Sequence, residues 1–301
     1  MTTRALFGGD VEDRPNGNPG PRIHLGNVFS DMNRGGAAIT IATGRAAERI
    51  GRLTSGTLIP DGRSTEQSHP FTTQEFPALD LQATGLVPKH GPARGARAWL
   101  RSMMCLLWPS GPVTPRGLTA IRLADVVISK GGYVFVDRAS LRSLLSFWQT
   151  AFPLIFAART GATVVTGPTS IGPFAHPIAR WVNGIILRSL DLVVARDALS
   201  FDEAVRLGVH SDRLALLPDI AFSLAPPTIR DTRLAQEKLK LPALARYACF
   251  VLRHDSGTSD PDGILKAQIH AARTLVHEDL VDYIVVARQV PNLISPPETT
   301  F

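Results

Sequence analysis

The feature that most constrains the fold is an alternation of short apolar runs with longer helical patterns, regular from Ala124 onward. The runs are apolar at nearly every position, which is typical of strands in a parallel sheet covered by helices on both faces. The pattern predicts an α/β fold with a Rossmann-like parallel sheet. We expect strands at 124–129, 162–166, 192–195 and 214–217, with helices at about 139–159, 177–188 and 200–207.

The N-terminal part predicts a similar unit of strand, loop and helix. Residues 22–28 fit a first strand, a polar turn follows, and residues 37–50 carry apolar side chains at helical spacing. Residues 1–20 are rich in glycine, proline and charge, so we expect a disordered leader. Residues 61–90 show little periodicity and are expected to form a long loop.

The same reading divides the chain into two domains. An N-terminal α/β domain is expected over residues 21–224, and a proline-rich polar stretch at 225–244 predicts a linker. Residues 245–301 predict the start of a second α/β domain. This stretch is short for a doubly wound domain, so we expect a C-terminally incomplete one. Its expected elements are a strand at 247–252, a helix at 264–277 and a strand at 283–287.

Composition narrows the choice of partners. The formal net charge is +6, but the basic residues are scattered and form no stripe, which argues against a nucleic-acid partner. The glycine-rich fingerprints of nicotinamide-cofactor and P-loop proteins are absent, as are His-Glu-x-x-His and Cys-x-x-Cys. We therefore expect no cofactor and no metal ion.

Localisation is predicted from three features. The most apolar stretch, residues 144–158, falls short of the roughly 20 residues that span a bilayer, so it predicts a buried helix. The N-terminus lacks a signal-peptide pattern, and Cys105 and Cys249 both lie in apolar runs. These features favour a cytoplasmic protein, and the positive charge allows peripheral association with the inner face of the cell membrane.

Four loops follow predicted strands. In open α/β sheets, ligands bind beyond the carboxyl ends of the strands, where helix N-termini offer free N–H groups. We therefore expect these loops to converge at one edge of the sheet, although turn chemistry alone would explain each one separately. They are residues 33–37, 130–132, 167–174 and 196–200.

Taken in order, these segments resemble the polysaccharide pyruvyl transferase family. The resemblance extends over about residues 22–290. It implies two facing α/β domains, similar to those of GT-B glycosyltransferases. It also implies transfer of a pyruvyl group from phosphoenolpyruvate to a sugar or lipid-linked oligosaccharide of the cell surface, usually as a ketal. The segments that carry it are Asn33-x-Gly35, Ile128-Ser-Lys-Gly-Gly132, Thr169-Ser-Ile-Gly-Pro-Phe174, Ala195-Arg-Asp-Ala-Leu-Ser200, Leu207-Gly-Val209 and Leu217-Pro-Asp-Ile-Ala-Phe222.

The resemblance suggests a set of site residues. Arg196 is the candidate catalytic residue, because a guanidinium group can grip a carboxylate or phosphate with two parallel hydrogen bonds. A simpler interpretation is that Arg196 pairs with Asp197 or another nearby acid. Asp197 and Ser200 are predicted to cap the following helix. The other expected substrate-binding residues are Asn33, Gly35, Gly131, Gly132, Ser170, Gly172 and Arg253.

The sequence departs from the family pattern at two places. Gly36 stands where the N-terminal motif has an acidic residue, and the family's late Arg-Leu-His motif, with its proton-transferring histidine, is absent before Phe301. We therefore assign no general acid and expect residues 1–301 alone to bind donor weakly and turn over little. Two alternatives stay open: a GT-B glycosyltransferase that uses a nucleotide sugar, and a non-catalytic relative that binds a sugar or a partner.

Overall fold

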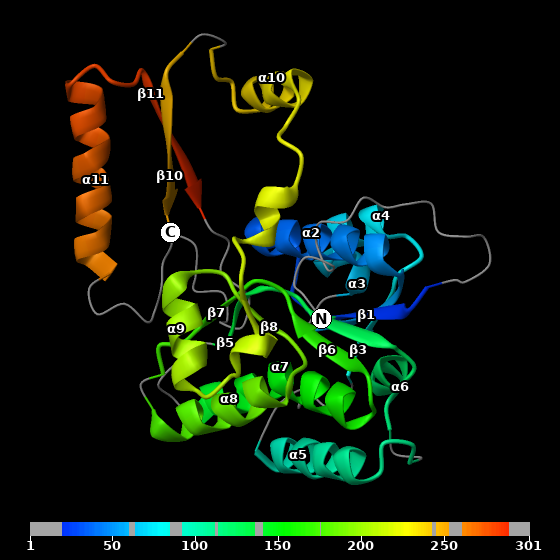
Figure 1. The fold of residues 1–301 in the computed structure, drawn as a ribbon. Coiled ribbons are helices and arrows are strands. Elements are labelled where there is room, and N and C mark those ends of the chain that lie inside the picture. The colour runs from blue at the N-terminus through cyan, green and yellow to red at the C-terminus, as the bar shows by residue number, and fades with distance from the viewer. Residues whose placement is uncertain are drawn as a thin grey trace. The chain divides into compact units, whose positions relative to one another are not determined.

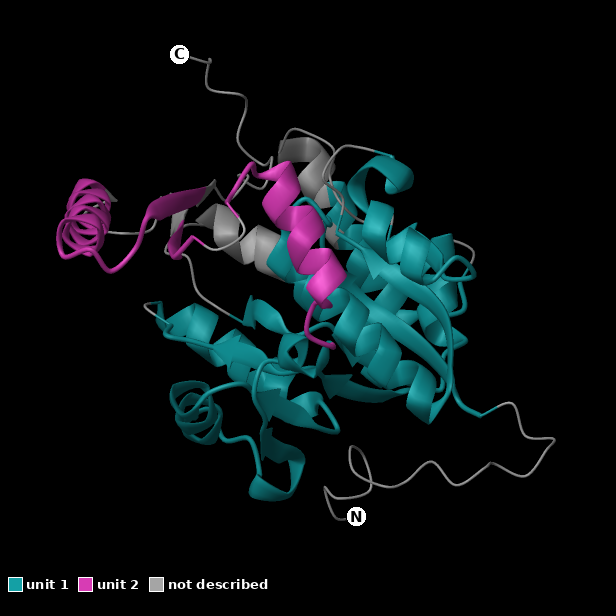
Figure 2. Ribbon diagram, turned by 90° about the horizontal axis from the view of Figure 1, so that it is seen from above, with its two compact units in different colours: residues 1–224 teal, residues 225–301 magenta. Residues whose placement is uncertain are grey.

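The computed structural model divides into two compact units, residues 1–224 and 225–301 (Figure 2). The predicted leader lies outside the described residues, except for Gly20. The structure describes residues 20–59, 64–84, 92–111, 114–135, 141–174, 176–242, 245–252 and 261–288.

The first unit is a parallel α/β structure (Figure 1). The strands predicted near 22–28, 124–129, 162–166, 192–195 and 214–217 are all present. In chain order the elements are β1 Arg22–Val28, α2 Arg34–Ile50, β2 Arg52–Leu58, α3 Thr65–Ser68, α4 Pro70–Glu75, β3 Asp80–Ala83, α5 Pro92–Leu107, α6 Arg116–Arg122, β4 Val126–Ser129, β5 Gly132–Phe135, α7 Leu141–Arg159, β6 Thr163–Thr166, β7 Thr169–Ile171, α8 Pro177–Ser189, β8 Val193–Ala195, α9 Ala198–Arg206, η1 Ser211–Arg213, β9 Leu214–Leu216 and η2 Ile220–Ser223.

The strands form two parallel ladders that follow one another. The first has the order β3-β2-β1-β4-β6 and the second the order β5-β7-β8-β9. Strand β5 follows β4 after two residues, and β7 follows β6 after two residues. A parallel bridge between Val165 and Leu192 also joins β6 to the start of β8. The combined order is that of a doubly wound fold whose direction reverses between β1 and β4, so the predicted fold class is confirmed.

Helices cover the sheet on both faces. Helix α2 lies on one side, and α7 and α8 lie on the other (Figure 1). Helix α7 packs against β1, β4, β5 and β6, and its side chains Phe152, Leu154 and Phe156 are buried in the main core. Burial on both faces explains why β4 and β6 are apolar runs rather than alternating ones. The stretch 144–158 is therefore part of a helix that packs against the sheet, as predicted.

Two expectations need correction. Residues 61–90 were expected to form a long loop, but their described part contains the helices α3 and α4 and the strand β3. Segment 225–244, predicted to be a linker, contains helix α10 Ile229–Lys238, which begins with a reciprocal capping box between Thr228 and Asp231. Short capped helices have too few turns to show a periodic apolar pattern, so the sequence reading missed them.

The second unit shows the predicted succession of strand, helix and strand. Strand β10 Tyr247–Leu252 pairs in parallel with β11 Tyr283–Arg288 over its whole length, and α11 Pro261–His277 connects them. None of the described helices in either unit is long and apolar enough to cross a membrane.

Candidate functional site

The reversal of strand order between β1 and β4 locates the candidate site. Ligands of doubly wound proteins bind beyond the carboxyl ends of the strands at this switch point. In this protein, β1 leads through residues 29–33 into the first turn of α2, and β4 leads into Lys130 and Gly131. These two segments are therefore the first place to look for ligand-binding groups.

Lys130 directly follows β4, and its side chain is almost entirely buried. Its backbone N–H donates to Gly26 O at 2.9 Å, and its side chain is only 3% exposed. The ammonium nitrogen lies 4.8 Å from the centre of the Phe29 ring, and a methyl group added at Gly36 would lie 3.2 Å from it. Among the described residues, no carboxylate lies within salt-bridge distance of this nitrogen. The Lys130 ammonium thus lies against the first turn of α2 without a direct ion pair.

Burial perturbs the ionisation of this lysine. Removal of the ammonium from water lowers the pKa of Lys130 to about 8, and the more distant carboxylates of Asp31 and Asp219 oppose this shift. Lys130 is therefore a cation that titrates close to physiological pH. Strongly perturbed ionisable groups gather at functional sites, which adds to the case for this edge of the sheet.

Asp31 and Asp219 use their carboxylate oxygens elsewhere. The fully buried Asp31 accepts hydrogen bonds from the Phe71 and Thr72 backbone N–H groups and from Thr72 Oγ1, so it caps the start of α4. Asp219 accepts from Ala221 N at 3.0 Å and pairs with Arg196 at 3.4 Å. Both acids contribute negative potential at the site while their own hydrogen bonds hold them in place.

Asn33 occupies the N-cap of α2. Its side chain accepts from Gly36 N at 3.1 Å, and the backbone N–H groups of Arg34 and Gly35 find no acceptor among the described residues. Such free N–H groups and the helix dipole favour an anion. The predicted residues Asn33 and Gly35 therefore lie at an exposed helix N-terminus next to Lys130.

Arg196 follows β8 and is held by three neighbours. Its guanidinium pairs with Asp219 at 3.4 Å and Asp197 at 3.8 Å, and it lies 4.3 Å from the centre of the Tyr133 ring. Its side chain is 18% exposed. The pairing considered as the simpler interpretation of Arg196 is therefore present, and Asp219 links Arg196 electrostatically to Lys130. A ligand anion at Arg196 would have to share it with these carboxylates.

The predicted capping role is present for Asp197 but not for Ser200, which lies in the first turn of α9. Asp197 is the N-cap of α9, and its side chain accepts from Ser200 N at 2.8 Å. Ser200 Oγ in turn accepts from Ile171 N at 3.1 Å and ties α9 to the end of β7. These contacts make both side chains part of the framework that positions Arg196.

Two of the predicted glycines have a packing role. A methyl group added at Gly131 would lie 2.1 Å from the Pro168 carbonyl oxygen, so only glycine allows the loops after β4 and β6 to approach this closely. Gly132 has φ +102 and donates to the same carbonyl at 3.0 Å. The structure thus brings the loops at 130–132 and 167–168 together.

The remaining predicted residues lie farther from Lys130 along the sheet. Ser170 is buried in the middle of β7, and Gly172 follows β7, where its N–H donates to Phe135 O at 2.8 Å. A Cβ atom at Gly172 would lie 3.0 Å from the Glu203 side chain of α9. Arg253 lies outside the described residues. The loops thus follow one another along the carboxyl edge, with Gly172 beyond the end of β7.

Asn27 adds an unmet polar group to this edge. It is fully buried, has φ +60, and donates from Nδ2 to Ser129 Oγ at 3.0 Å. Its side-chain oxygen finds no donor among the described residues. Native proteins pair most buried polar atoms, so the carboxyl end of β1 holds an acceptor whose bonding is incomplete.

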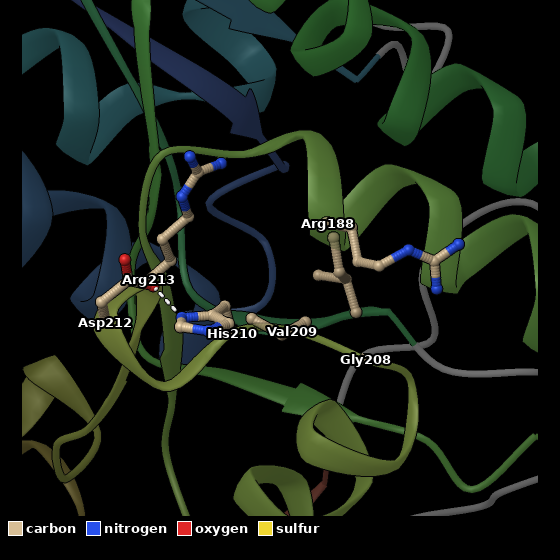
Figure 3. A pocket seen from close by; sticks show the side chains of 7 residues that line it. Arg188, Gly208, Val209, His210, Asp212 and Arg213 are labelled. Carbon is tan, nitrogen blue, oxygen red and sulfur yellow. Dashed lines mark hydrogen bonds and ion pairs between the residues drawn. The ribbon is translucent and has the colours of Figure 1, made fainter.

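A pocket of about 400 Å³ lies at the other edge of the sheet (Figure 3). It is formed by the end of α8 and the segment that precedes β9, at the amino ends of β8 and β9. Its exposed His210 and Asp212 hydrogen-bond to each other at 2.6 Å. These two side chains are exposed and already paired with each other, so the hollow itself gives no chemical reason to place the active site there. Across the described part of the chain, we also find no cluster of side chains suited to hold a metal ion.

Sequence reasoning missed Lys130, Asp31 and Asp219 as site residues. Lys130 stood in a segment singled out for its glycines, and Asp219 in a segment that supported the family resemblance. The available signal was a lysine directly after an apolar strand, where a charged side chain needs a reason to be buried. The importance of Lys130 depends on strand order, because strand order brings β4 beside β1.

The fold and this edge define a class: a doubly wound α/β protein with a candidate anion-binding site at its switch point. The sequence profile of the polysaccharide pyruvyl transferase family matches residues 33–286, so the chain belongs to that family. No curated protein sequence matched the chain.

Several solved structures resemble the chain at low sequence identity. Anabaena Alr3699/HepE in complex with UDP and glucose shares 9% identity and a TM-score of 0.45, covering 90% of this chain and 70% of that one. The UDP-GlcNAc 2-epimerase of Methanocaldococcus jannaschii shares 12% identity and a TM-score of 0.48, covering 90% of this chain and 66% of that one. S. aureus MnaA, in a co-structure with UDP, shares 12% identity and a TM-score of 0.49, covering 91% of this chain and 64% of that one.

Proposed function

We propose that this protein transfers a pyruvyl group from phosphoenolpyruvate to a sugar of a cell-surface polysaccharide or glycolipid, forming a ketal. The observation that carries the proposal is the family match over residues 33–286, which includes the segment around Arg196. The location of Arg196 at the carboxyl edge supports it, because this is where the fold binds ligands. The proposal needs no cofactor beyond the donor itself.

The reaction requires an acid, anion-binding groups and a place for two sugar hydroxyls. A proton added to the methylene carbon of phosphoenolpyruvate leaves positive charge on the neighbouring carbon, which one hydroxyl attacks. Phosphate leaves as the second hydroxyl closes the ketal. The two hydroxyl protons are released, so one replaces the proton taken from the acid and one leaves with the phosphate. Preorganised charges that stabilise these steps would contribute most of the catalysis.

Arg196 is the residue we assign to the donor. Its planar guanidinium can hold a carboxylate with two parallel hydrogen bonds, and Tyr133 and Asp219 restrict its orientation before the donor arrives. Asn33 and Gly35 would approach the ligand through the N-terminus of α2, Gly132 at the start of β5, and Gly172 through the loop that follows β7. We assign no general acid.

The proposed acceptor is a sugar or a lipid-linked oligosaccharide, and the proposed location is the cytoplasm with peripheral attachment to the inner membrane face. Helix α5 supports the attachment, because it presents an apolar stripe and contains no acidic residue. Exposed Arg97 and Arg101 on the same helix complement an anionic lipid surface. The stripe consists of Leu100, Met104, Leu107 and the adjoining Trp108.

Phosphate release tests the reaction directly. The protein is incubated with phosphoenolpyruvate and a panel of sugar and lipid-linked acceptors, and the ketal methyl group is followed by NMR. We expect phosphate and ketal to appear together with one acceptor class, and phosphoenolpyruvate to raise the melting temperature. If UDP-sugars raise the melting temperature and phosphoenolpyruvate does not, the protein is a glycosyltransferase and the proposal is wrong.

Vesicle sedimentation tests the attachment. Binding to vesicles that contain anionic phospholipid should exceed binding to neutral vesicles, and replacing Leu107 and Trp108 with serine should abolish the difference. Replacing exposed Leu199 of α9 with serine is the matched control, since it removes an apolar side chain from another helix. If the stripe instead forms a dimer interface, the wild type should not bind vesicles, and replacing Leu107 and Trp108 should change the sedimentation velocity of the protein.

A further inference from the structure

We propose that Lys130 and the backbone N–H groups of Arg34 and Gly35 form a subsite for a tetrahedral oxyanion, such as the phosphoryl group of the donor. The oxyanion site follows from the geometry of the switch point alone. Only the identification of its occupant as the donor's phosphoryl group rests on the proposed function.

The first argument is the burial of a charge without a direct partner. Lys130 is 3% exposed, and its ammonium nitrogen lies over the Phe29 ring. An ammonium group removed from water destabilises the fold unless a counter-charge and hydrogen bonds compensate. An aromatic face compensates only in part. The ammonium group therefore has hydrogen-bonding capacity that a bound anion would use.

The second argument is that both nearby acids are bonded to other groups. Three donors already occupy the Asp31 carboxylate: Phe71 N, Thr72 N and Thr72 Oγ1. One oxygen of Asp219 accepts from Ala221 N, and the other pairs with Arg196. Both carboxylates act on Lys130 through space only. The described residues thus give the ammonium group no direct ion pair.

The third argument is the position of the ammonium group at the start of α2. This helix has 17 residues, so its N-terminus carries a full helix dipole. The ammonium nitrogen would lie 3.2 Å from a methyl group at Gly36, within the first turn whose N–H groups at Arg34 and Gly35 are free. Gly36 has no side chain to fill this space. A cation and two N–H donors thus surround one position, which suits a phosphoryl group.

Inorganic phosphate is the probe for this subsite. Calorimetry or a thermal shift should detect saturable phosphate binding to the full chain. The variant Lys130→Met should weaken that binding by about tenfold or more, since a hydrogen bond to a charged group is lost. Lys238→Met is the matched control, because it removes an exposed ammonium group from α10. Equal phosphate affinity in Lys130→Met and wild type would overturn the proposal.

A second pair of variants tests the site with Lys130 in place. Gly36→Asp puts a carboxylate beside the ammonium group, where it should occupy the oxyanion position and abolish phosphate binding. An acidic residue in the first turn also favours the helix, so this variant should fold. Gly36→Asn has the same shape without the charge and should lower affinity much less. If both variants bind phosphate like wild type, the space beside Gly36 is not the subsite.

The pH dependence gives a readout that a purely structural role would not change. An anion that contacts Lys130 raises the pKa of this lysine, so phosphate binding near pH 8 should take up a proton from the buffer. The charged groups that act on Lys130 are Asp31 and Asp219. Arg196 pairs with Asp219, and the guanidinium of Arg34, in the first turn of α2, lies over the Phe71 ring. Proton uptake should disappear in Gly36→Asp. Phosphate binding with no proton uptake in the wild type would contradict contact with Lys130.

Two further ligands separate this inference from the proposed function. Pyruvate carries a carboxylate and no phosphoryl group. If pyruvate competes with phosphoenolpyruvate for binding and phosphate does not, the subsite holds a carboxylate and the phosphoryl assignment is wrong. Phosphate binding that depends on Lys130, without any ketal product from phosphoenolpyruvate, would refute the proposed function and leave the oxyanion subsite standing.

Discussion

The middle of the sheet and its carboxyl edge treat buried basic groups in opposite ways. In the middle, the fully buried His24 of β1 makes hydrogen bonds through both ring nitrogens, to Ser55 and Thr57 of β2. At the edge, Lys130 keeps an ammonium group that no described side chain pairs with directly. The buried imidazole that serves the structure thus has both of its nitrogens paired. The unmet group lies where the fold can receive a ligand.

The amino edge supports the same contrast. Arg22 and Asp125, at the starts of β1 and β4, form two side-chain hydrogen bonds and one from the Arg22 backbone. The pocket at this edge contains the paired His210 and Asp212 (Figure 3). An open hollow is therefore a weaker sign of function here than a buried charge without a partner.

The largest expected effect concerns His24 and the acid sensitivity of the fold. Burial lowers the pKa of His24 to about 3, so the folded state holds it neutral while the unfolded chain binds a proton below about pH 6.5. Stability should therefore fall as pH decreases through this window, by about 1.4 kcal/mol per pH unit from this residue. Urea unfolding at several pH values measures the slope.

The variant His24→Gln isolates this contribution, because glutamine can hydrogen-bond to Ser55 and Thr57 without titrating. We expect it to be less stable than wild type at neutral pH but to lose less stability on acidification. If the free energy of unfolding depends on pH in the same way in His24→Gln and wild type, the folded protein stabilises protonated His24 as well. The contrast with Lys130 would then be lost.

Lys130→Met should have the opposite effect on stability, raising it at pH 7. The folded-state pKa of Lys130 is lowered from 10.5 to about 8, so below pH 8 the fold bears the full penalty of a buried cation. Removing this penalty should stabilise the protein by on the order of 2 kcal/mol. The wild type gains stability as pH rises from 8 towards 10.5, so the advantage of methionine should shrink over that range. Denaturation at neutral and alkaline pH measures both effects. A destabilised variant at pH 7 would show that the ammonium group is satisfied internally.

Arg196→Lys should weaken phosphoenolpyruvate binding by about tenfold, because lysine keeps the charge but loses the planar pair of donors. Calorimetry measures the affinity. Arg180→Lys on α8 is a suitable control, since the recognised ion pair of its guanidinium among the described residues is a long contact of 3.6 Å with Glu203. Unchanged affinity in Arg196→Lys would indicate that Arg196 serves only the ion pairs with Asp219 and Asp197, and that the donor is held elsewhere.

The sequence predicted the strands whose burial on both faces leaves an apolar run, such as β4, β6 and β8. It missed β2 because that strand carries Ser55 and Thr57, whose hydroxyls serve His24 rather than an apolar core. It also missed β5 and β7, which lie within loops that glycine and proline mark as turns. The pattern of apolar residues in a segment predicts which of its side chains are buried. It does not predict which residue of another segment a polar side chain hydrogen-bonds to.

The same limit applies to the candidate site. Arg196 was predictable because it directly follows a recognisable strand, and Asn33 because it precedes a recognisable helix. The role of Gly131 was not, since its close approach to Pro168 arises only when β4 and β6 become neighbours. Lys130 and Asp219 are 89 residues apart in sequence numbering. Their proximity is a consequence of strand order, so their mutual influence on charge could not be read from either segment.

The smallest expected effect shows whether Asp219 competes with the donor for Arg196 or positions Arg196 for the donor. Asp219 pairs with Arg196 at 3.4 Å, and the two side chains are 24% and 18% exposed. A partly hydrated pair at this distance contributes less than about 1 kcal/mol. An incoming anion must share Arg196 with Asp219, so Asp219→Asn should raise the affinity for phosphoenolpyruvate by about threefold. Asparagine can still accept from Ala221 N, which preserves the start of η2.

Asp197→Asn is the matched control: it removes a charge 3.8 Å from the same guanidinium and still caps α9, so its effect should be smaller. Titration calorimetry at about pH 6.5, where Lys130 is protonated in both variants, measures the difference. A lower affinity in Asp219→Asn would mean that Asp219 positions Arg196 for the donor, and the carboxyl edge would then contain a preorganised ion pair rather than unmet charge alone.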